Sequence, residues 1–229
     1  MGTRVQGQFC PIVMAAEILS PRWSIVILSE MMQGSTRFNE LRRGIPRLSP
    51  ALLSKRLKEL EDWGILDRRI TGSGETPEYF LTEAAEELRP IIDAMANWTH
   101  KWIDSRMDPD HLDAQLLMWH VRRNLNPDPA PKRRTVVQFI YPELPQKERN
   151  YWMIVEPGRD VDLCSLEPGH NVDLFINADL LSMTRAFMGQ SSLEREIDRD
   201  RIVLTGDIGT ERNFRKWFVQ SSFAQKPGA

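Results

Sequence analysis

The sequence has little of what marks several large classes of protein. It contains only two cysteines in 229 residues, Cys10 and Cys164, so it has no disulfide framework and a reducing compartment is expected. No apolar run approaches the ~20 residues that a transmembrane helix needs. The first residues lack the basic and apolar regions of a signal peptide. We therefore expect a cytoplasmic protein that does not insert into a membrane.

An excess of charge of one sign is also missing, because 30 Lys and Arg residues against 32 Asp and Glu residues give a net charge of −2. A partner such as nucleic acid must therefore be met by a local basic patch. The four histidines do not pair with one another or with the cysteines at metal-ligand spacing. No Gly-rich phosphate loop, nucleophile elbow or pair of acids stands out. We expect no metal, no cofactor and no enzymatic activity.

The clearest element that is present is a helix over residues 50–63. Ser49 precedes it as a suitable N-cap, and Pro50 fits its first position, where a missing N–H costs nothing. Its apolar side has the i, i+4, i+7 spacing of a stripe that faces a core, formed by Leu53, Leu57 and Leu60. The opposite side is basic near the start of the helix and acidic toward its end.

Other helices and a hairpin surround this element. Further helices are expected over residues 10–20, 21–34, 36–44 and 82–103. Thr36 is the expected cap of the third helix, and Pro90 should kink the last one or delay its start. Two strand-like runs, 66–70 and 78–81, flank a Gly-Ser-Gly sequence that is typical of a hairpin. A helix, a turn, a second helix and a hairpin form the winged helix-turn-helix arrangement.

A basic patch coincides with this arrangement. Between residues 37 and 58 the chain has seven Lys and Arg residues and a single acid, Glu40. In a winged helix-turn-helix the second helix reads bases with its N-terminal turns, so acids at its C-terminal end can face away from DNA. The patch lies where this fold would meet phosphates. The sequence therefore predicts double-stranded DNA as a partner.

Several motifs occur here in the order and spacing of a known family. They are the Cys-Pro pair at residue 10, the Arg-Trp pair at residue 22, "RFNELRR", "LSKRLKELEDWGILDR" and "PEYFLTE". On these motifs, residues 8–103 resemble the HxlR-type winged-helix transcriptional regulators, relatives of the MarR group. The resemblance implies a homodimer, with an interface built by the outer helices near Cys10–Ser20 and Glu83–Ile103, and a palindromic operator.

The same arrangement suggests roles for individual residues. Those expected to face base edges are Ser49, Ala51, Leu52 and Lys55, with Ser54 on the flank. Those expected to contact the DNA backbone or the minor groove are Arg37, Arg47, Arg68, Arg69 and Ser73. Arg56 lies on the side of the helix, where it would contact a phosphate or brace the support helix. Taken singly, each basic residue could equally be an ordinary solvated charge.

The second half of the chain predicts an α+β domain. Strands are expected over 135–143, 150–158, 161–169, 172–178 and 201–207, and helices over 111–125, 180–189, 192–200 and 211–221. The sheet should be mostly antiparallel. Apolar residues occupy both faces of the strands, with Met153 and Val155 expected on the face opposite Phe139. We place the domains at 1–105 and 106–229.

This second half, from about Leu112 to Val219, resembles the sterol-carrier-protein-like (type 2) domain. The resemblance is carried by "YWMIVEPGRDVDLCSLEPGHNVDLFINADLLSMTRAFMGQ" and, after a gap, "RIVLTGDIGTERNFRKWF". It implies an apolar cavity between sheet and helices that binds a lipid-like molecule. The candidate wall residues are Phe139, Trp152, Ile154, Leu163, Phe175, Leu181, Met183, Phe187, Met188, Phe214, Trp217 and Phe218. The alternative is an ordinary packed core, which needs the same residue types.

Together these observations predict a dimeric, DNA-binding transcriptional regulator whose C-terminal domain senses or binds an apolar small molecule. Two alternatives remain open. Cys10 stands at a helix N-terminus, where the dipole favours a thiolate, so the protein could be a redox-sensing regulator with a purely structural C-terminal domain. It could also be a lipid-binding module that uses the winged helix mainly to dimerise, although the basic patch argues against this.

Overall fold

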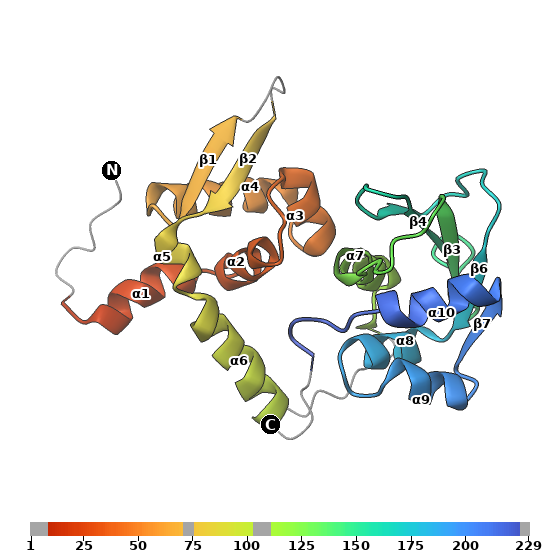
Figure 1. Cartoon of the computed structure of the whole chain (residues 1–229). Helices are drawn as coiled ribbons and strands as arrows, with labels where there is room; N and C mark the ends of the chain where they lie inside the picture. Colours follow the sequence, from red (N-terminus) through yellow and green to blue (C-terminus); the bar gives the residue numbers. More distant parts are fainter. Residues whose placement is uncertain (1–8, 71–75, 103–110, 225–229) are drawn as a thin grey trace. The chain divides into compact units, whose positions relative to one another are not determined.

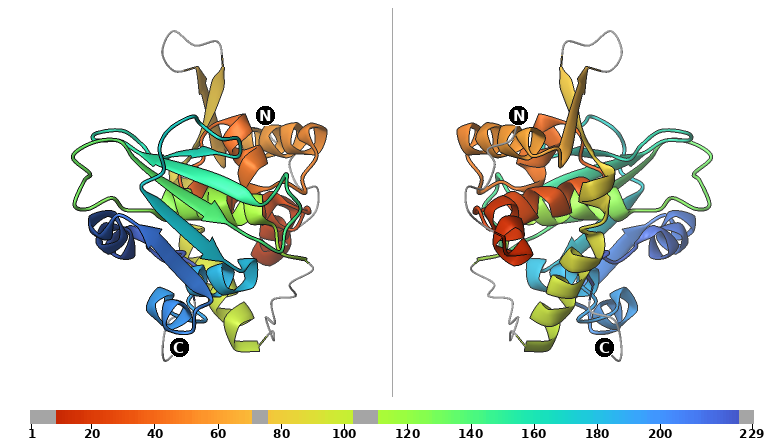
Figure 2. Two further views of the ribbon diagram at one scale, coloured as in Figure 1. Left: turned by 90° about the vertical axis from the view of Figure 1, so that its right-hand side faces the viewer. Right: turned by 90° about the vertical axis from the view of Figure 1, so that its left-hand side faces the viewer.

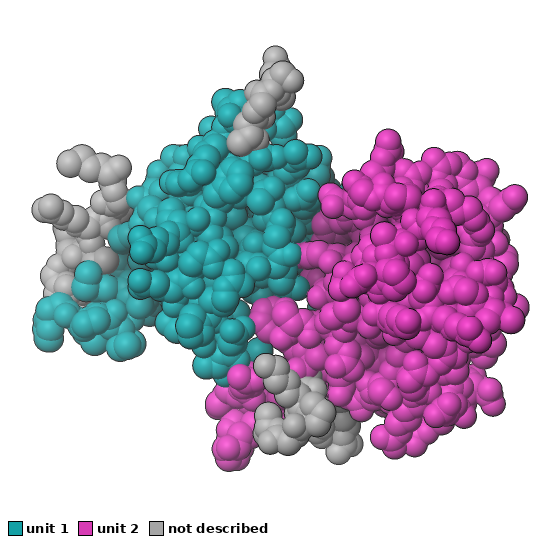
Figure 3. Space-filling model, viewed as in Figure 1, with its two compact units in different colours: residues 1–96 teal, residues 97–229 magenta. Residues whose placement is uncertain are grey.

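The computed structural model describes residues 9–70, 76–102 and 111–224. It divides the chain into two compact units, Met1–Ala96 and Asn97–Ala229 (Figure 3). The expected domain boundary after residue 105 falls outside the described residues and stays a prediction.

The first unit is mostly helical and carries one antiparallel hairpin (Figure 1). Its elements are α1 (Pro11–Leu19), α2 (Ser24–Met32), α3 (Phe38–Gly44), α4 (Pro50–Asp62), β1 (Leu66–Ile70), β2 (Pro77–Leu81), α5 (Glu83–Glu86) and the start of α6 (Arg89–Trp102). Both views of Figure 2 show the hairpin extending away from the helices of this unit. Along the described residues no single helix is long and apolar enough to cross a membrane; α1 and α2 pass only as a pair bent by 77°.

The predicted helices of this unit are confirmed, with one correction at a cap. Arg37, not Thr36, is the N-cap of α3. The Glu40 carboxylate reaches back and accepts hydrogen bonds from the backbone N–H groups of Thr36 and Arg37, at 2.9 and 3.0 Å. A glutamate at the third helical position satisfies these otherwise unpaired donors, so the threonine hydroxyl is not needed. Pro90 delays the last helix as predicted, since α6 begins only at Arg89.

The second unit is an α+β fold built on one five-stranded sheet. Its elements are α7 (Ala114–Asn124), β3 (Thr135–Ile140), β4 (Asn150–Val155), β5 (Asp162–Cys164), β6 (Leu174–Ala178), α8 (Leu180–Phe187), α9 (Leu193–Asp198), β7 (Ile202–Gly206) and α10 (Ile208–Trp217). The strand order is β5-β4-β3-β6-β7. All neighbouring pairs are antiparallel except β3 with β6, so the expected mostly antiparallel sheet is confirmed.

The register of this sheet corrects the predicted faces. Val137 pairs with Met153, and Phe139 pairs with Tyr151. Met153 and Val155 therefore share the face of Phe139, whereas Trp152 and Ile154 lie on the opposite face. Side chains alternate along a strand, so an error of one residue in the assumed register places every side chain of that strand on the wrong face of the sheet. The lengths of two strand-like segments in the sequence do not determine the register in which the strands pair.

The core of the second unit lies between the Phe139 face and the helices. Helices α7, α8 and α10 contribute Met118, Met183 and Trp217, none of which has accessible surface. Phe139 meets Phe214 edge to face, with ring centroids 5.8 Å apart. The indole N–H of Trp217 donates to the carbonyl oxygen of Pro129 at 3.0 Å, so this buried polar group is satisfied. The helices therefore cover one face of the sheet.

Candidate functional site

Helix α4 presents its first turns to solvent. The Ser49 hydroxyl accepts from the backbone N–H of Leu52 at 3.3 Å, which is the predicted N-cap. The helix buries Leu53, Leu57 and Leu60. This orientation leaves Ala51, Ser54 and Lys55 exposed and Leu52 half-buried. The side of α4 that faces away from the core is therefore small and basic near its N-terminus.

Several of the predicted DNA-contacting arginines have partners within the protein. The Arg37 guanidinium lies 2.7 Å from the Glu78 carboxylate on β2. Arg56 donates from Nε to the backbone carbonyl of Arg22 at 3.1 Å and also pairs with Glu59, so it braces the segment before α2. The sequence left open whether Arg56 contacts a phosphate or braces the support helix, α3; in the structure its partner outside α4 is instead Arg22, before α2. The long-range partner of Arg37 has no local signal in the sequence.

The cations with the fewest partners flank α4. Over the described part of the first unit, neither Arg47 nor Arg68 pairs with a carboxylate, and both are exposed. The Lys55 ammonium is 3.9 Å from Glu59, a loose surface contact. Arg69 pairs with Asp67 at 2.8 Å. Ser73, which was expected in the hairpin, lies outside the described residues.

The hairpin is attached to the helical part of the unit through β2 and the residue that follows it. The backbone N–H of Tyr79 donates to the carbonyl oxygen of Thr36 at 2.8 Å, so β2 extends toward the start of α3. The Thr82 hydroxyl donates to the carbonyl oxygens of Gly64 and Ile65 at 2.9 and 3.1 Å. These bonds hold the hairpin beside the end of α4. A helix pair with an exposed second helix and a fixed hairpin defines the winged helix-turn-helix class.

Comparison with known proteins agrees with this class. The HxlR-like helix-turn-helix family matches residues 18–107. The HTH-type transcriptional regulator YvaP of Bacillus subtilis is 40% identical over 112 residues, which cover 47% of this chain and 98% of that protein. The chain belongs to the HxlR family of transcriptional regulators.

Two further relatives cover the same part of the chain. An HTH-type transcriptional regulator of Methanothermobacter thermautotrophicus is 33% identical over 92 residues, which cover 39% of this chain and 69% of that protein. The solved structure of the reduced form of the transcriptional regulator YodB from B. subtilis is 31% identical, with a TM-score of 0.38, and covers 42% of this chain and 97% of that chain.

The two cysteines have different surroundings. Cys10 is the N-cap of α1, is partly exposed, and makes no side-chain capping hydrogen bond. Cys164 is at the end of β5, and burial raises the pKa of its thiol. No group of three or more His, Cys, Asp or Glu side chains that could hold a metal ion occurs among residues 9–70, 76–102 and 111–224.

The residues expected to line one apolar pocket are divided between the two faces of the sheet. Those that belong to the helix-covered core are Phe139, Met183, Phe187, Phe214 and Trp217, with Leu163, Met188 and Phe218 packed against it. Those on the opposite face are Trp152, Ile154 and Phe175. A side chain that lined a ligand cavity would have accessible surface, whereas Phe139, Met183 and Trp217 have none. A pocket on these three residues stays a prediction that requires the core to open.

Proposed function

We propose that the protein binds a palindromic DNA operator as a homodimer and that its C-terminal unit binds a small molecule that modulates this binding. We further propose residues 1–105 as the DNA-binding and dimerisation domain and residues 106–229 as the ligand-binding domain. The observation that carries the DNA part is the exposed N-terminal half of α4, with Lys55 on the helix and Arg47 and Arg68 on either side. Family membership supports the same function.

Exposed apolar side chains support the homodimer. On α6, Trp98 and Trp102 keep 57% and 65% of their surface, and Met95 is also exposed. On α1, Ile12 keeps 76%. Large apolar side chains at helical spacing on two helices are typical of a surface that another subunit covers. Introducing a charge with Met95→Glu should shift the protein toward the monomer in sedimentation equilibrium; an unchanged mass would place the interface elsewhere.

The DNA-binding proposal can be tested with three variants of one surface. Lys55→Ala should weaken operator binding by ~1–3 kcal/mol and relax sequence preference if Lys55 contacts a base. Arg68→Ala should weaken binding to all sequences alike and reduce the salt slope by about one. Lys58→Ala is the matched control, since Lys58 lies further along α4 and pairs with Asp62 at 2.8 Å.

The measurement is fluorescence anisotropy with an operator selected from random duplexes and with an unrelated duplex, each at several salt concentrations. Unchanged affinity in both the Lys55 and Arg68 variants would remove the proposed DNA-binding face. A loss in Lys58→Ala as large as that in Lys55→Ala would mean that only the total charge matters.

The ligand part of the proposal is supported by the resemblance of the C-terminal unit to sterol-carrier-like domains. A ligand that binds the folded state raises the unfolding midpoint by mass action. Long-chain apolar compounds should therefore raise the unfolding midpoint. If such a compound changes the affinity of the protein for operator by some factor, operator should change the affinity of the protein for that compound by the same factor. If no apolar compound moves the midpoint, the unit does not sense such molecules through its core.

A cysteine-based switch is a second candidate. The partly exposed Cys10 thiol at the start of α1 favours it, because a helix N-terminus stabilises a thiolate. In that case the C-terminal unit would be structural. The third candidate, a lipid-binding module that uses the winged helix only to dimerise, gives no role to Arg47, Lys55 and Arg68.

A further inference from the structure

A polar cleft of about 440 Å³ opens on the second unit. Its residues come from four segments: α7, the residue before β3, the stretch from the end of β4 to the first residue of β5, and the β5–β6 connection. The side chains that line it are Arg122, Arg134, Ile154, Glu156, Arg159, Asp160, Val161, Asp162 and His170. Pockets that hold small metabolites have volumes of this order.

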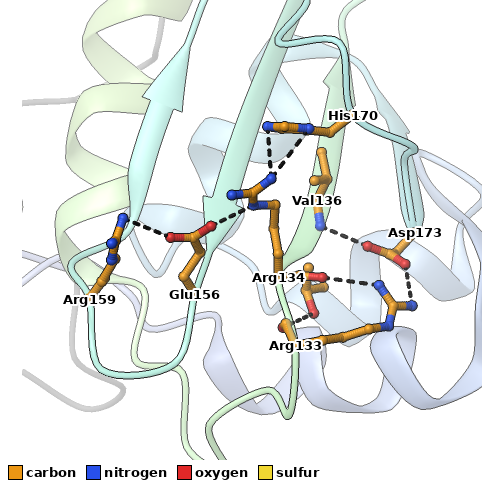
Figure 4. Close-up of polar contacts among 8 residues, drawn as sticks. Arg133, Arg134, Val136, Glu156, Arg159, His170 and Asp173 are labelled. Carbon is orange, nitrogen blue, oxygen red and sulfur yellow. Dashed lines mark hydrogen bonds and ion pairs between the residues drawn. The ribbon is translucent and has the colours of Figure 1, made fainter.

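One carboxylate, Glu156, orients two of the arginines that line the cleft. The Glu156 carboxylate lies 2.5 Å from Arg134 Nε and 3.1 Å from Arg159 Nη1, so its two oxygens bind two different arginines (Figure 4). The hydrogen bond from Arg134 is the main reason that the pKa of Glu156 is lowered. Arg134 Nη1 also lies 3.2 Å from His170 Nε2. Glu156 is therefore a fixed anion that orients both guanidinium groups.

The two arginines have more donors than the protein uses. A guanidinium carries about five N–H donors. Within the described chain, the side-chain partners of Arg134 are Glu156 and His170, and the partner of Arg159 is Glu156 alone. The Arg159 side chain is 77% exposed, whereas Glu156 is only 19% exposed. The shared carboxylate is thus largely covered, whereas the Arg159 guanidinium, which also lines the cleft, is accessible to a ligand.

The other residues that line the cleft limit which ligands could accept hydrogen bonds from these N–H groups. Ile154 and Val161 supply an apolar wall. Asp160 and Asp162 also line the cleft, so a ligand with a large negative charge would meet two carboxylates. Charge-assisted hydrogen bonds from paired guanidinium groups suit a planar carboxylate or a phosphate. The lining therefore fits one anionic group attached to a small carbon skeleton.

We propose that this cleft binds a small organic molecule through a single carboxylate or phosphate group held by Arg134 and Arg159. The lining lies within the second unit and does not include Phe139, Met183 or Trp217, and the proposal does not depend on operator binding. Failure of this inference would leave the operator proposal intact, and the reverse also holds.

The test uses three probes that share one ring and differ in charge. Benzoate carries a carboxylate, phenyl phosphate carries a phosphate, and benzamide is neutral. Isothermal titration calorimetry on the full chain at constant ionic strength should give saturable binding of at least one anionic probe and none of benzamide. The anionic probe that binds identifies the source of the oxyanion.

Variants then tie binding to the cleft. Arg159→Gln and Arg134→Gln should each weaken the anionic probe by about tenfold or more, because each removes charged donors. Arg159 is the safer substitution, since its exposed side chain contributes little to folding. Arg212→Gln, at an exposed position on α10, is the matched control and should bind as the unaltered protein does. Absence of saturable binding of both anions, equal binding of benzamide, or unchanged affinity in both cleft variants would overturn the inference.

Discussion

A buried carboxylate in the first unit leaves no room for a side chain at one glycine. Gly44 is the last residue of α3, and Glu30 on α2 is buried with 3% of its surface exposed. The Ser35 hydroxyl donates to Glu30 Oε1 at 2.7 Å, which holds the carboxylate in place. A Cβ added to Gly44 would lie 2.0 Å from Oε1 and 2.1 Å from Cδ of Glu30. Gly44→Ala must therefore displace the carboxylate or separate α2 from α3.

The size of this effect follows from its parts. Losing a buried hydrogen bond to a charged group costs ~1.5–3 kcal/mol, and repacking around an added methyl group costs ~1–3 kcal/mol. Alanine returns ~1 kcal/mol of helix propensity relative to glycine. We expect Gly44→Ala to lower the free energy of unfolding of the first unit by about 2–5 kcal/mol. Gly34→Ala is the control, because Gly34 has a φ of +103° but open space around it, so only backbone strain of ~1–2 kcal/mol applies.

Native-state hydrogen exchange is the suitable assay, because a global midpoint would mix two units. Protection of amides in α2 and α3 should fall further in Gly44→Ala than in Gly34→Ala, by about 2 kcal/mol or roughly 30-fold when the middles of the two ranges are compared. Glu30→Ala should relieve the clash, so the double variant should lose less than the sum of the two single losses. Additive losses, or equal losses in the two glycine variants, would refute a direct contact between Gly44 and Glu30.

Three further predictions concern a cap, the C-terminal core and a thiol. The pKa of Asp207 is lowered, first because the Thr210 N–H donates to its carboxylate. The ionised carboxylate therefore stabilises the fold at neutral pH, and this stabilisation is lost as the pH falls below the ordinary range for aspartate. The unfolding midpoint of Asp207→Ala should lie below that of the unaltered protein at pH 7, and the two midpoints should meet in acid. Phe214→Ala should cost ~3–5 kcal/mol in denaturant unfolding, because this ring is fully buried and packs against Phe139. If Cys10 is a sensor, Cys10→Ser should bind operator as the unaltered protein does yet lose any response to peroxide; an unchanged response to peroxide in Cys10→Ser would favour a packing role.

Much of the first unit could be predicted from sequence because its signals are local. Ser49 and Pro50 mark the start of α4 within two adjacent residues, and the leucine stripe fixes which side is buried. What the sequence could not provide was the state of each cation. Arg37 pairs with Glu78, which is 41 residues away, and this pairing exists only once the hairpin lies beside α3. A count of basic residues therefore overstated the number that are available to DNA.

In the second unit the strands could be predicted from the sequence, but the site residues could not. Each strand was found from its own apolar residues, but the face of Trp152 and Ile154 depends on how β4 pairs with β3. Apolar residue types signal burial, and a packed core and a ligand pocket use the same types. Three of the aromatic residues that suggested a pocket, Phe139, Phe214 and Trp217, have no accessible surface, whereas Phe175 on the opposite face keeps 38% of its surface.

The residues of the polar cleft gave no signal of a site in the sequence. Arg134, Glu156 and His170 each look like an ordinary surface charge in sequence, and they are spread over three connections. They meet because the strand order β5-β4-β3-β6 places the end of β4, the start of β3 and the connection into β6 next to one another at the same end of the sheet. A binding site made of charged loop residues requires that topology before its chemistry is visible. The proposed anion site is thus the part of this unit with the weakest sequence signal, and the calorimetric test should begin with anions.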